Sequence, residues 1–127
     1  MVADDEEPIR QVVAELLSPH YDLVGIVANG RELVEGARTL RPHLVIVDIT
    51  MPDMNGFEAV SQMRSDGIAA KIVFFTANGS PIYVRKALSL GATGYVLKAV
   101  GMEELLEAVE IVLNGGTFIS PCLGIER

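Results

Sequence analysis

The sequence has little cysteine and no long run of apolar residues. Its single cysteine, Cys122, excludes an internal disulfide and fits a reducing cytoplasm. No apolar run approaches the ~20 residues that a membrane helix requires, so no transmembrane segment is predicted. Residues 1–7 are rich in acidic side chains, the opposite of a signal peptide. Together these features predict a cytoplasmic protein.

Basic residues are also scarce. The 127 residues include 10 lysines and arginines against 17 aspartates and glutamates, which gives a formal net charge of −7. This charge argues against direct binding to nucleic acid or to an anionic membrane surface, because both attract lysine and arginine. Half of the residues are hydrophobic and 21% are charged, as is typical of one globular domain with a single core.

Short apolar runs alternate five times with amphipathic stretches. This pattern predicts βα repeats around a parallel sheet, an α/β fold. The run at 43–49 is almost wholly apolar, so that strand is expected to be buried on both faces. Asn29 and Ser80 are expected to cap the second and fourth helices. The expected strands are 2–3, 21–28, 43–49, 70–75 and 93–97, and the expected helices are 8–17, 30–40, 57–64, 81–90 and 102–113.

Polar side chains stand where four of these strands end. Asp4 and Asp5 follow the first strand, Asp48 ends the third, Thr76 follows the fourth and Lys98 follows the fifth. The carboxyl ends of parallel strands share one edge of the sheet, and ligands of open α/β sheets bind there. We therefore expect these side chains to converge on one site.

The chemistry of this set suits a phosphoryl group. Asp48 can act as a nucleophile toward phosphorus and form an acyl phosphate. Asp4 and Asp5 would complete an oxygen-only site beside it, which suits Mg²⁺. Lys98 can pair with Asp48 at rest and with phosphoryl oxygens afterwards, and the Thr76 hydroxyl can donate to a phosphoryl oxygen.

Each residue also has a simpler structural interpretation. Asp48 alone is as well explained as a turn-capping residue, Thr76 as an ordinary strand residue and Lys98 as a surface lysine. The acidic residues at 4–7 favour the dipole of the first helix, and Glu6 and Glu7 are assigned to that role. The position of Tyr95 on its strand predicts packing at the surface. The conjunction of four placements on one edge favours the phosphoryl site.

These residues resemble the receiver domain of bacterial two-component response regulators over nearly the whole chain. The most specific segment is 48–56, Asp-Ile-Thr-Met-Pro-Asp-Met-Asn-Gly, which resembles the D-x-x-M-P-x-x-x-G loop of that family. Segments 4–5, 76–77 and 91–98 match its other signature positions. Segment 91–98, together with Glu103-Glu104-Leu105 and Gly115-Gly116, is most similar to the NarL/LuxR-type branch.

The resemblance implies a flavodoxin-like (βα)₅ three-layer sandwich with parallel sheet order 2-1-3-4-5. It implies that a sensor histidine kinase phosphorylates Asp48 and that Mg²⁺ is held by Asp4, Asp5, Asp48 and the backbone carbonyl of Thr50. Lys98 would bind the phosphoryl group, and Asp48, Lys98 and Thr76 would be the catalytic residues.

The resemblance also implies a switch and an output. Thr76 and Tyr95 would form the switch pair, and the face of the fourth helix, fifth strand and fifth helix would bind an output domain or a second receiver. Thr50 and Asn78 are candidates to tune slow self-dephosphorylation. The domain is signalling rather than enzymatic. Residues 1–116 would be the receiver, and 117–127 a tail or linker stub toward an output domain that regulates transcription through DNA.

Other readings remain open. The chain could be a stand-alone receiver or a phosphate-independent interaction domain. A flavin module would need a phosphate-binding loop after the first strand, where this chain has Asp-Asp-Glu-Glu. An aspartyl-phosphate hydrolase would need a second acid two residues after the nucleophile, where Thr50 stands. Two features depart from the family: only Val2-Ala3 precede the acidic pair, and Ala99 follows Lys98 where many relatives carry proline.

Overall fold

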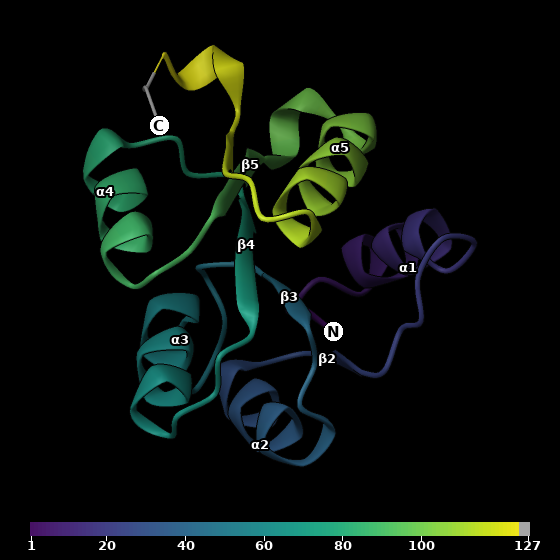
Figure 1. Cartoon of the computed structure of the whole chain (residues 1–127), viewed down its shortest axis with the longest axis vertical. Coiled ribbons are helices and arrows are strands. Elements are labelled where there is room, and N and C mark those ends of the chain that lie inside the picture. The colour runs from purple at the N-terminus through teal and green to yellow at the C-terminus, as the bar shows by residue number, and fades with distance from the viewer. Residues whose placement is uncertain (125–127) are drawn as a thin grey trace.

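A computed structural model describes residues 1–124, which form three layers around a parallel sheet (Figure 1). In this part of the chain the sheet has the order β2-β1-β3-β4-β5-β6. The strands are β1 (Val2–Ala3), β2 (Ile26–Val27), β3 (Leu44–Val47), β4 (Lys71–Thr76), β5 (Gly94–Leu97) and β6 (Phe118–Ile119). The helices are α1 (Glu7–Leu17), α2 (Gly30–Leu40), α3 (Gly56–Ser65), α4 (Pro81–Ser89) and α5 (Met102–Leu113), with short 3₁₀ turns η1 (Lys98–Val100) and η2 (Pro121–Leu123). The predicted α/β class and the order of the first five strands are confirmed.

Helices cover both faces of the sheet. Helices α2, α3 and α4 lie on one face, and α1 and α5 lie on the other (Figure 1). Alternate side chains of strand β3 point to opposite faces of the sheet. Val45 and Val47 pack in the core under α2–α4, whereas Leu44 and Ile46 pack in the core under α1 and α5. All four residues of β3 are buried, as the apolar run predicted.

Local capping fixes where the helices begin. The Asn29 side chain accepts a hydrogen bond from the Glu32 N–H at 2.8 Å, so the predicted cap of α2 is confirmed. Helix α3 begins with a reciprocal capping box between Asn55 and Glu58. Ser80 is the N-cap residue of α4 and Pro81 begins the helix, as predicted, but the Ser80 side chain makes no capping bond.

Strand β6 extends the sheet beyond the predicted five strands. Phe118 and Ile119 pair in parallel with Gly94 and Tyr95, in a segment expected to be a tail or linker. Phe118 packs into the core under α1 and α5, and Ile119 into the core under α2–α4. Two residues are too few for strand periodicity to stand out in a sequence. As a result β5 is not the edge of the sheet, because β6 lies beside it between α4 and α5 (Figure 1).

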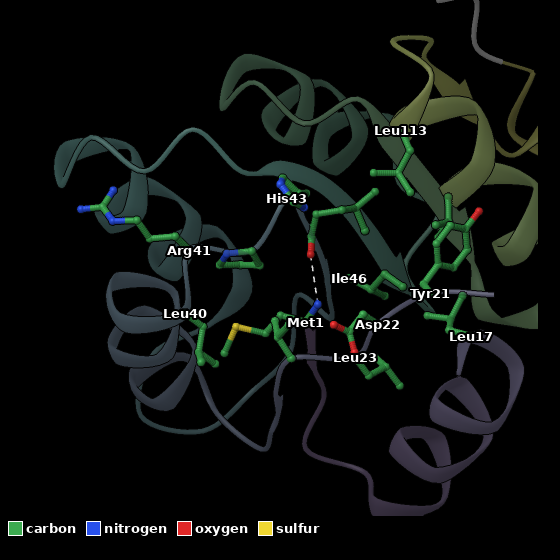
Figure 2. A pocket seen from close by; sticks show the side chains of 14 residues that line it. Met1, Leu17, Tyr21, Asp22, Leu23, Leu40, Arg41, His43, Ile46 and Leu113 are labelled. Carbon is green, nitrogen blue, oxygen red and sulfur yellow. Dashed lines mark hydrogen bonds between the residues drawn. The ribbon is translucent and has the colours of Figure 1, made fainter. Parts of the chain in front are cut away.

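Strand β1 has only two residues, yet it is an interior strand between β2 and β3. Val2 pairs with Ile26 of β2 and with Ile46 of β3. The strand expected at 21–28 forms only at 26–27, because a strand extends only as far as its partner. The Met1 amino group donates to the Leu44 carbonyl oxygen at 3.1 Å beside a largely apolar hollow of about 300 Å³ (Figure 2). Burial lowers the pKa of that amino group.

The described helices are all too short or too polar to cross a bilayer.

Candidate functional site

The sheet brings the predicted site residues to one edge. Ala3 is in register with Val47, and Thr76 with Leu97, so the residues that follow these strands meet at the carboxyl edge. The Asp48 N–H donates to the Ala3 carbonyl oxygen at 3.0 Å, which fixes the start of the loop after β3 beside the end of β1. A pocket opens at this edge, and it is lined by Asp5, Glu6, Asp48, Thr50, Thr76, Ala77, Asn78, Gly79 and Lys98.

Lys98 binds two buried carboxylates. Its Nζ lies 2.8 Å from an oxygen of Asp4 and 3.0 Å from an oxygen of Asp48, and both aspartates are buried. The Lys98 side chain is itself only 13% exposed. A buried carboxylate is costly unless a cation compensates it, so one ammonium here stabilises two ionised groups.

The pKa values follow from this arrangement. Burial raises the pKa of Asp48, although the hydrogen bond and charge of Lys98 oppose the rise, and the neighbouring charge of Asp4 adds to it. Burial also disfavours the Lys98 ammonium, but hydrogen bonds to Asp4 and Asp48 outweigh it, so the pKa of Lys98 is raised. At neutral pH the lysine therefore remains charged beside Asp48.

The acidic side chains outnumber the cation that faces them. Ligand oxygens of Asp4, Asp5, Glu6 and Asp48 all lie within 4.8 Å of one another. Such an oxygen-only set suits a hard cation such as Mg²⁺, which is bound through a few carboxylates and retained waters. A group of four carboxylates with a single lysine therefore fits a divalent cation. Asp4 is already oriented, because one of its oxygens accepts from the Glu6 N–H at 2.9 Å.

Glu6 belongs to this site, although the sequence interpretation assigned it to the dipole of α1. Its carboxylate lies 3.3 Å from Lys98 Nζ, so the assignment to the dipole alone is wrong. Glu6 is the N-cap residue of α1 and has extended backbone, which places its side chain on the pocket side. The sequence feature that could have indicated a place for Glu6 in the site is its position directly after Asp4 and Asp5. Glu7 begins α1, in keeping with the predicted role at the helix dipole.

Thr76 and Tyr95 both bond to the backbone of Asn78. The Thr76 hydroxyl accepts from the Asn78 N–H at 3.2 Å, and the Tyr95 hydroxyl donates to the Asn78 carbonyl oxygen at 2.5 Å. Thr76 is buried and lines the pocket, and its hydroxyl proton is free to donate. The loop after β4 therefore connects the two predicted switch residues directly.

Tyr95 is fully buried, so the predicted surface packing is wrong. Its ring contacts Phe74, and β6 covers the β5 edge at this residue. Burial, with the nearby charges of Tyr83 and Asp48, raises the pKa of Tyr95 to about 12. The phenol therefore stays protonated and can donate to Asn78 across the physiological pH range.

Thr50 and Asn78 also lie at the pocket, and both are exposed. The Asn78 side chain accepts from the Ser80 N–H at 2.9 Å, so it is engaged in its own loop. Their expected roles, in metal binding for Thr50 and in dephosphorylation for both, stay predictions.

Comparison with known proteins agrees with this architecture. Residues 1–110 match the family described as "Response regulator receiver domain". Over 125 residues the chain is 34% identical to the nitrate/nitrite response regulator protein NarL of Escherichia coli, covering 97% of this chain and 58% of that protein. It is 32% identical over 123 residues to the transcriptional regulatory protein LnrK of Bacillus subtilis, covering 95% and 56%. The chain thus spans little more than half the length of these relatives.

A solved structure gives the same result. A LuxR-family two-component response regulator from Aurantimonas sp. superposes with a TM-score of 0.92 at 32% identity, over 98% of this chain and 90% of that one. The predicted resemblance is confirmed by sequence, by fold and by the relatives' assignment to the NarL and LuxR types. The chain belongs to the response regulator receiver domain family.

Proposed function

We propose that this domain accepts a phosphoryl group on Asp48 from the phosphohistidine of a sensor kinase. The observation that supports this most is the Lys98 ammonium, which lies between two buried carboxylates at the ligand-binding edge of the sheet. An Asp48 oxygen attacks phosphorus as the phosphorus–nitrogen bond of the donor breaks. The electron pair of that bond returns to the histidine ring, which takes up a proton.

Several residues of the pocket would assist this transfer. Lys98 is placed to neutralise charge on the transferring oxygens, and the Thr76 hydroxyl to donate to one of them. Asp4, Asp5 and Asp48, with the Thr50 carbonyl, would hold Mg²⁺. When bound, the ion would screen the negative charges that otherwise keep phosphate away.

The contacts of Asn78 suggest how the switch would operate. A phosphoryl group that draws the Thr76 hydroxyl would compete with its bond to the Asn78 N–H. The opposite side of the Asn78 backbone holds the Tyr95 hydroxyl, so a shift of this loop would reach Tyr95. Phosphorylation would then shift a balance between two arrangements of the loop.

The partner surface lies around α4 and α5. Ile82 is 67% exposed, and Tyr83 and Val100 are also exposed, so α4 and η1 each present apolar side chains that a partner could cover. Because β6 covers the edge of β5, we propose that an output domain or second receiver meets α4, β6 and α5. The receiver then includes β6, and a linker toward a DNA-binding output domain would follow η2. We place this signalling in the cytoplasm, and the domain itself, at −7, does not contact DNA.

The test is intact mass after incubation with a small acyl phosphate, with and without Mg²⁺. One Mg²⁺-dependent phosphoryl adduct is expected, and Asp48→Asn should abolish it. Asp53→Asn is a matched control, because Asp53 is an exposed aspartate in the same loop whose φ of 67° suits asparagine. A folded protein without an adduct would refute phosphorylation and favour a phosphate-independent interaction domain. Unchanged decay of the adduct in Thr50 and Asn78 variants would refute their tuning role.

A further inference from the structure

Ser120 is a buried polar residue that the proposed reaction does not use. Among the described residues the buried polar and charged side chains are Asp4, Asp48, Thr76 and Ser120. The first three belong to the site, whereas Ser120 follows β6 in a segment expected to be a linker. Ser120 is 1% exposed, and a hydroxyl so deeply buried needs hydrogen-bond partners.

The first bond of the hydroxyl continues the β5–β6 ladder. The Phe118 N–H donates to the Thr93 carbonyl oxygen and the Ser120 N–H to the Tyr95 carbonyl oxygen, both at 2.9 Å. The Leu97 N–H, two residues further along β5, donates to the Ser120 Oγ at 3.0 Å instead of to a backbone oxygen. The Ser120 carbonyl has turned away to accept from Leu123 in η2. The hydroxyl therefore replaces a ladder carbonyl where β6 ends.

The second bond ties the same hydroxyl to α5. The Ser120 hydroxyl donates to the carboxylate of Glu104, which lies in the first turn of that helix. A hydrogen bond with an ionised acceptor is stronger than one between neutral groups. One buried side chain thus joins the end of β5 to the start of α5.

Lys98 lies between these two anchored points. Leu97 precedes it directly, and the connection 98–101 leads through η1 to α5. Gly101 has a φ of 97°, so this connection contains a left-handed residue that favours glycine. Ser120 therefore holds both ends of the short segment that carries the lysine, and its side-chain hydrogen bonds go to Leu97 and Glu104 rather than to Lys98, Asp4 or Asp48.

We propose that Ser120 is a positioning residue for Lys98. It keeps the ammonium within 2.8 Å of Asp4 and 3.0 Å of Asp48 by fastening Leu97 and Glu104. The expected effect on the phosphorylation rate rests on the function proposed for Asp48, whereas the expected effect on the position of the Lys98 ammonium does not depend on that function. Because Ser120 follows β6, the site also depends on the segment after α5.

A double-mutant cycle with Lys98 separates positioning from a general structural role. The rate of adduct formation with the small acyl phosphate is measured for wild type, Ser120→Ala, Lys98→Met and the double variant. If Ser120 positions Lys98, then Ser120→Ala alone should form the adduct about tenfold more slowly than wild type, since small misplacements of a catalytic group are costly. Ser120→Ala should then change the rate less than twofold in the Lys98→Met background. The control is Ile119→Val, which trims a buried side chain on β6 and should change neither rate by more than twofold.

Several outcomes would overturn the proposal: equal slowing by Ser120→Ala in both backgrounds, no slowing at all, or the same slowing by Ile119→Val. If Ser120→Ala does not fold, Glu104→Ala cuts the α5 bond alone, and the same cycle applies to it. If wild type takes no phosphoryl group, the proposed function fails, and the crystal structure of Ser120→Ala decides the positioning. A Lys98 ammonium displaced from Asp4 and Asp48 supports it, and one that stays on both overturns it.

Discussion

Replacing Lys98 by methionine should destabilise the domain strongly at neutral pH. Each ion pair of Lys98 with Asp4 and Asp48 spans 2.8–3.0 Å. At an effective dielectric constant of about 20, one such pair is worth about 6 kcal/mol before desolvation is subtracted. Methionine fills a similar volume but leaves two buried carboxylates without their cation. Breaking a buried pair in this way costs roughly 3–5 kcal/mol of the free energy of unfolding, against a total of about 5–15 for a small domain.

The free energy of unfolding lost in Lys98→Met should depend on pH, because Asp48 titrates. Burial already raises the pKa of Asp48 above its ordinary 3.8, and the hydrogen bond and charge of Lys98 hold that rise in check. Without the lysine, burial and the charge of Asp4 remain, so the pKa rises further. When the pKa of a carboxyl group is higher in the folded state than in the unfolded state, its protonation stabilises the fold. That stabilisation is complete below the unfolded-state pKa and is lost as pH rises through the folded-state pKa. The free energy of unfolding of Lys98→Met should therefore rise as pH falls from neutral toward 3.8, and its deficit relative to wild type should shrink.

Urea denaturation at pH 5 and pH 8 measures this directly, as the difference in free energy of unfolding between wild type and variant. Lys86→Met is the matched control, because the Lys86 Nζ lies over the Phe57 ring at 5.0 Å and, within residues 1–124, pairs with no buried carboxylate. Its cost should stay near ~1 kcal/mol at both pH values. Added Mg²⁺ should narrow the deficit of Lys98→Met, since a divalent cation can compensate the same carboxylates. A deficit under about 1 kcal/mol at pH 8, or one independent of pH, would refute the reasoning.

Three further predictions test the framework of the fold. Tyr95→Phe removes the bond to the Asn78 carbonyl oxygen and should lower the free energy of unfolding by about 1 kcal/mol in urea denaturation. Arg64→Lys should cost about 2 kcal/mol by thermal denaturation, because the guanidinium donates to four backbone carbonyls in the segments that follow α3 and α4, and lysine cannot reach them together. Asn55→Ala should cost about 1 kcal/mol through the capping box of α3, whereas Ser80→Ala, which loses no capping bond, should stay within about 0.5; equal costs would contradict the assignment.

The sequence was sufficient to predict that Asp48, Thr76 and Lys98 lie at one site, because strand ends can be located from apolar runs and the ends of parallel strands share one edge of the sheet. Capping at Asn29 was predictable for a similar reason, since its side chain acts on the next turn of chain. Both inferences depend on contacts that are local or repeat along every strand.

What the sequence did not show depends on pairing between distant segments. Tyr95 was placed at the surface because nothing in residues 93–97 reveals that β6 will cover that edge. The long strand expected at 21–28 failed because the length of β2 is set by β1, not by its own apolar residues. Glu6 was not predicted because it follows no strand: it is the N-cap residue of α1, where an acidic side chain is already explained by the helix dipole, and only the fold brings it to Lys98.

The position of Met1 has a practical consequence for how the protein is handled. The Met1 carbonyl accepts from the Ile46 N–H at 2.9 Å while its amino group bonds to Leu44, so the residue already follows the path of a strand. Anything joined to its amino side would begin beside the largely apolar hollow that Met1 lines. An apolar, extended leader would lengthen β1, and a charged or proline-containing one would work against it. Stabilities measured on differently tagged versions of this domain are therefore not interchangeable.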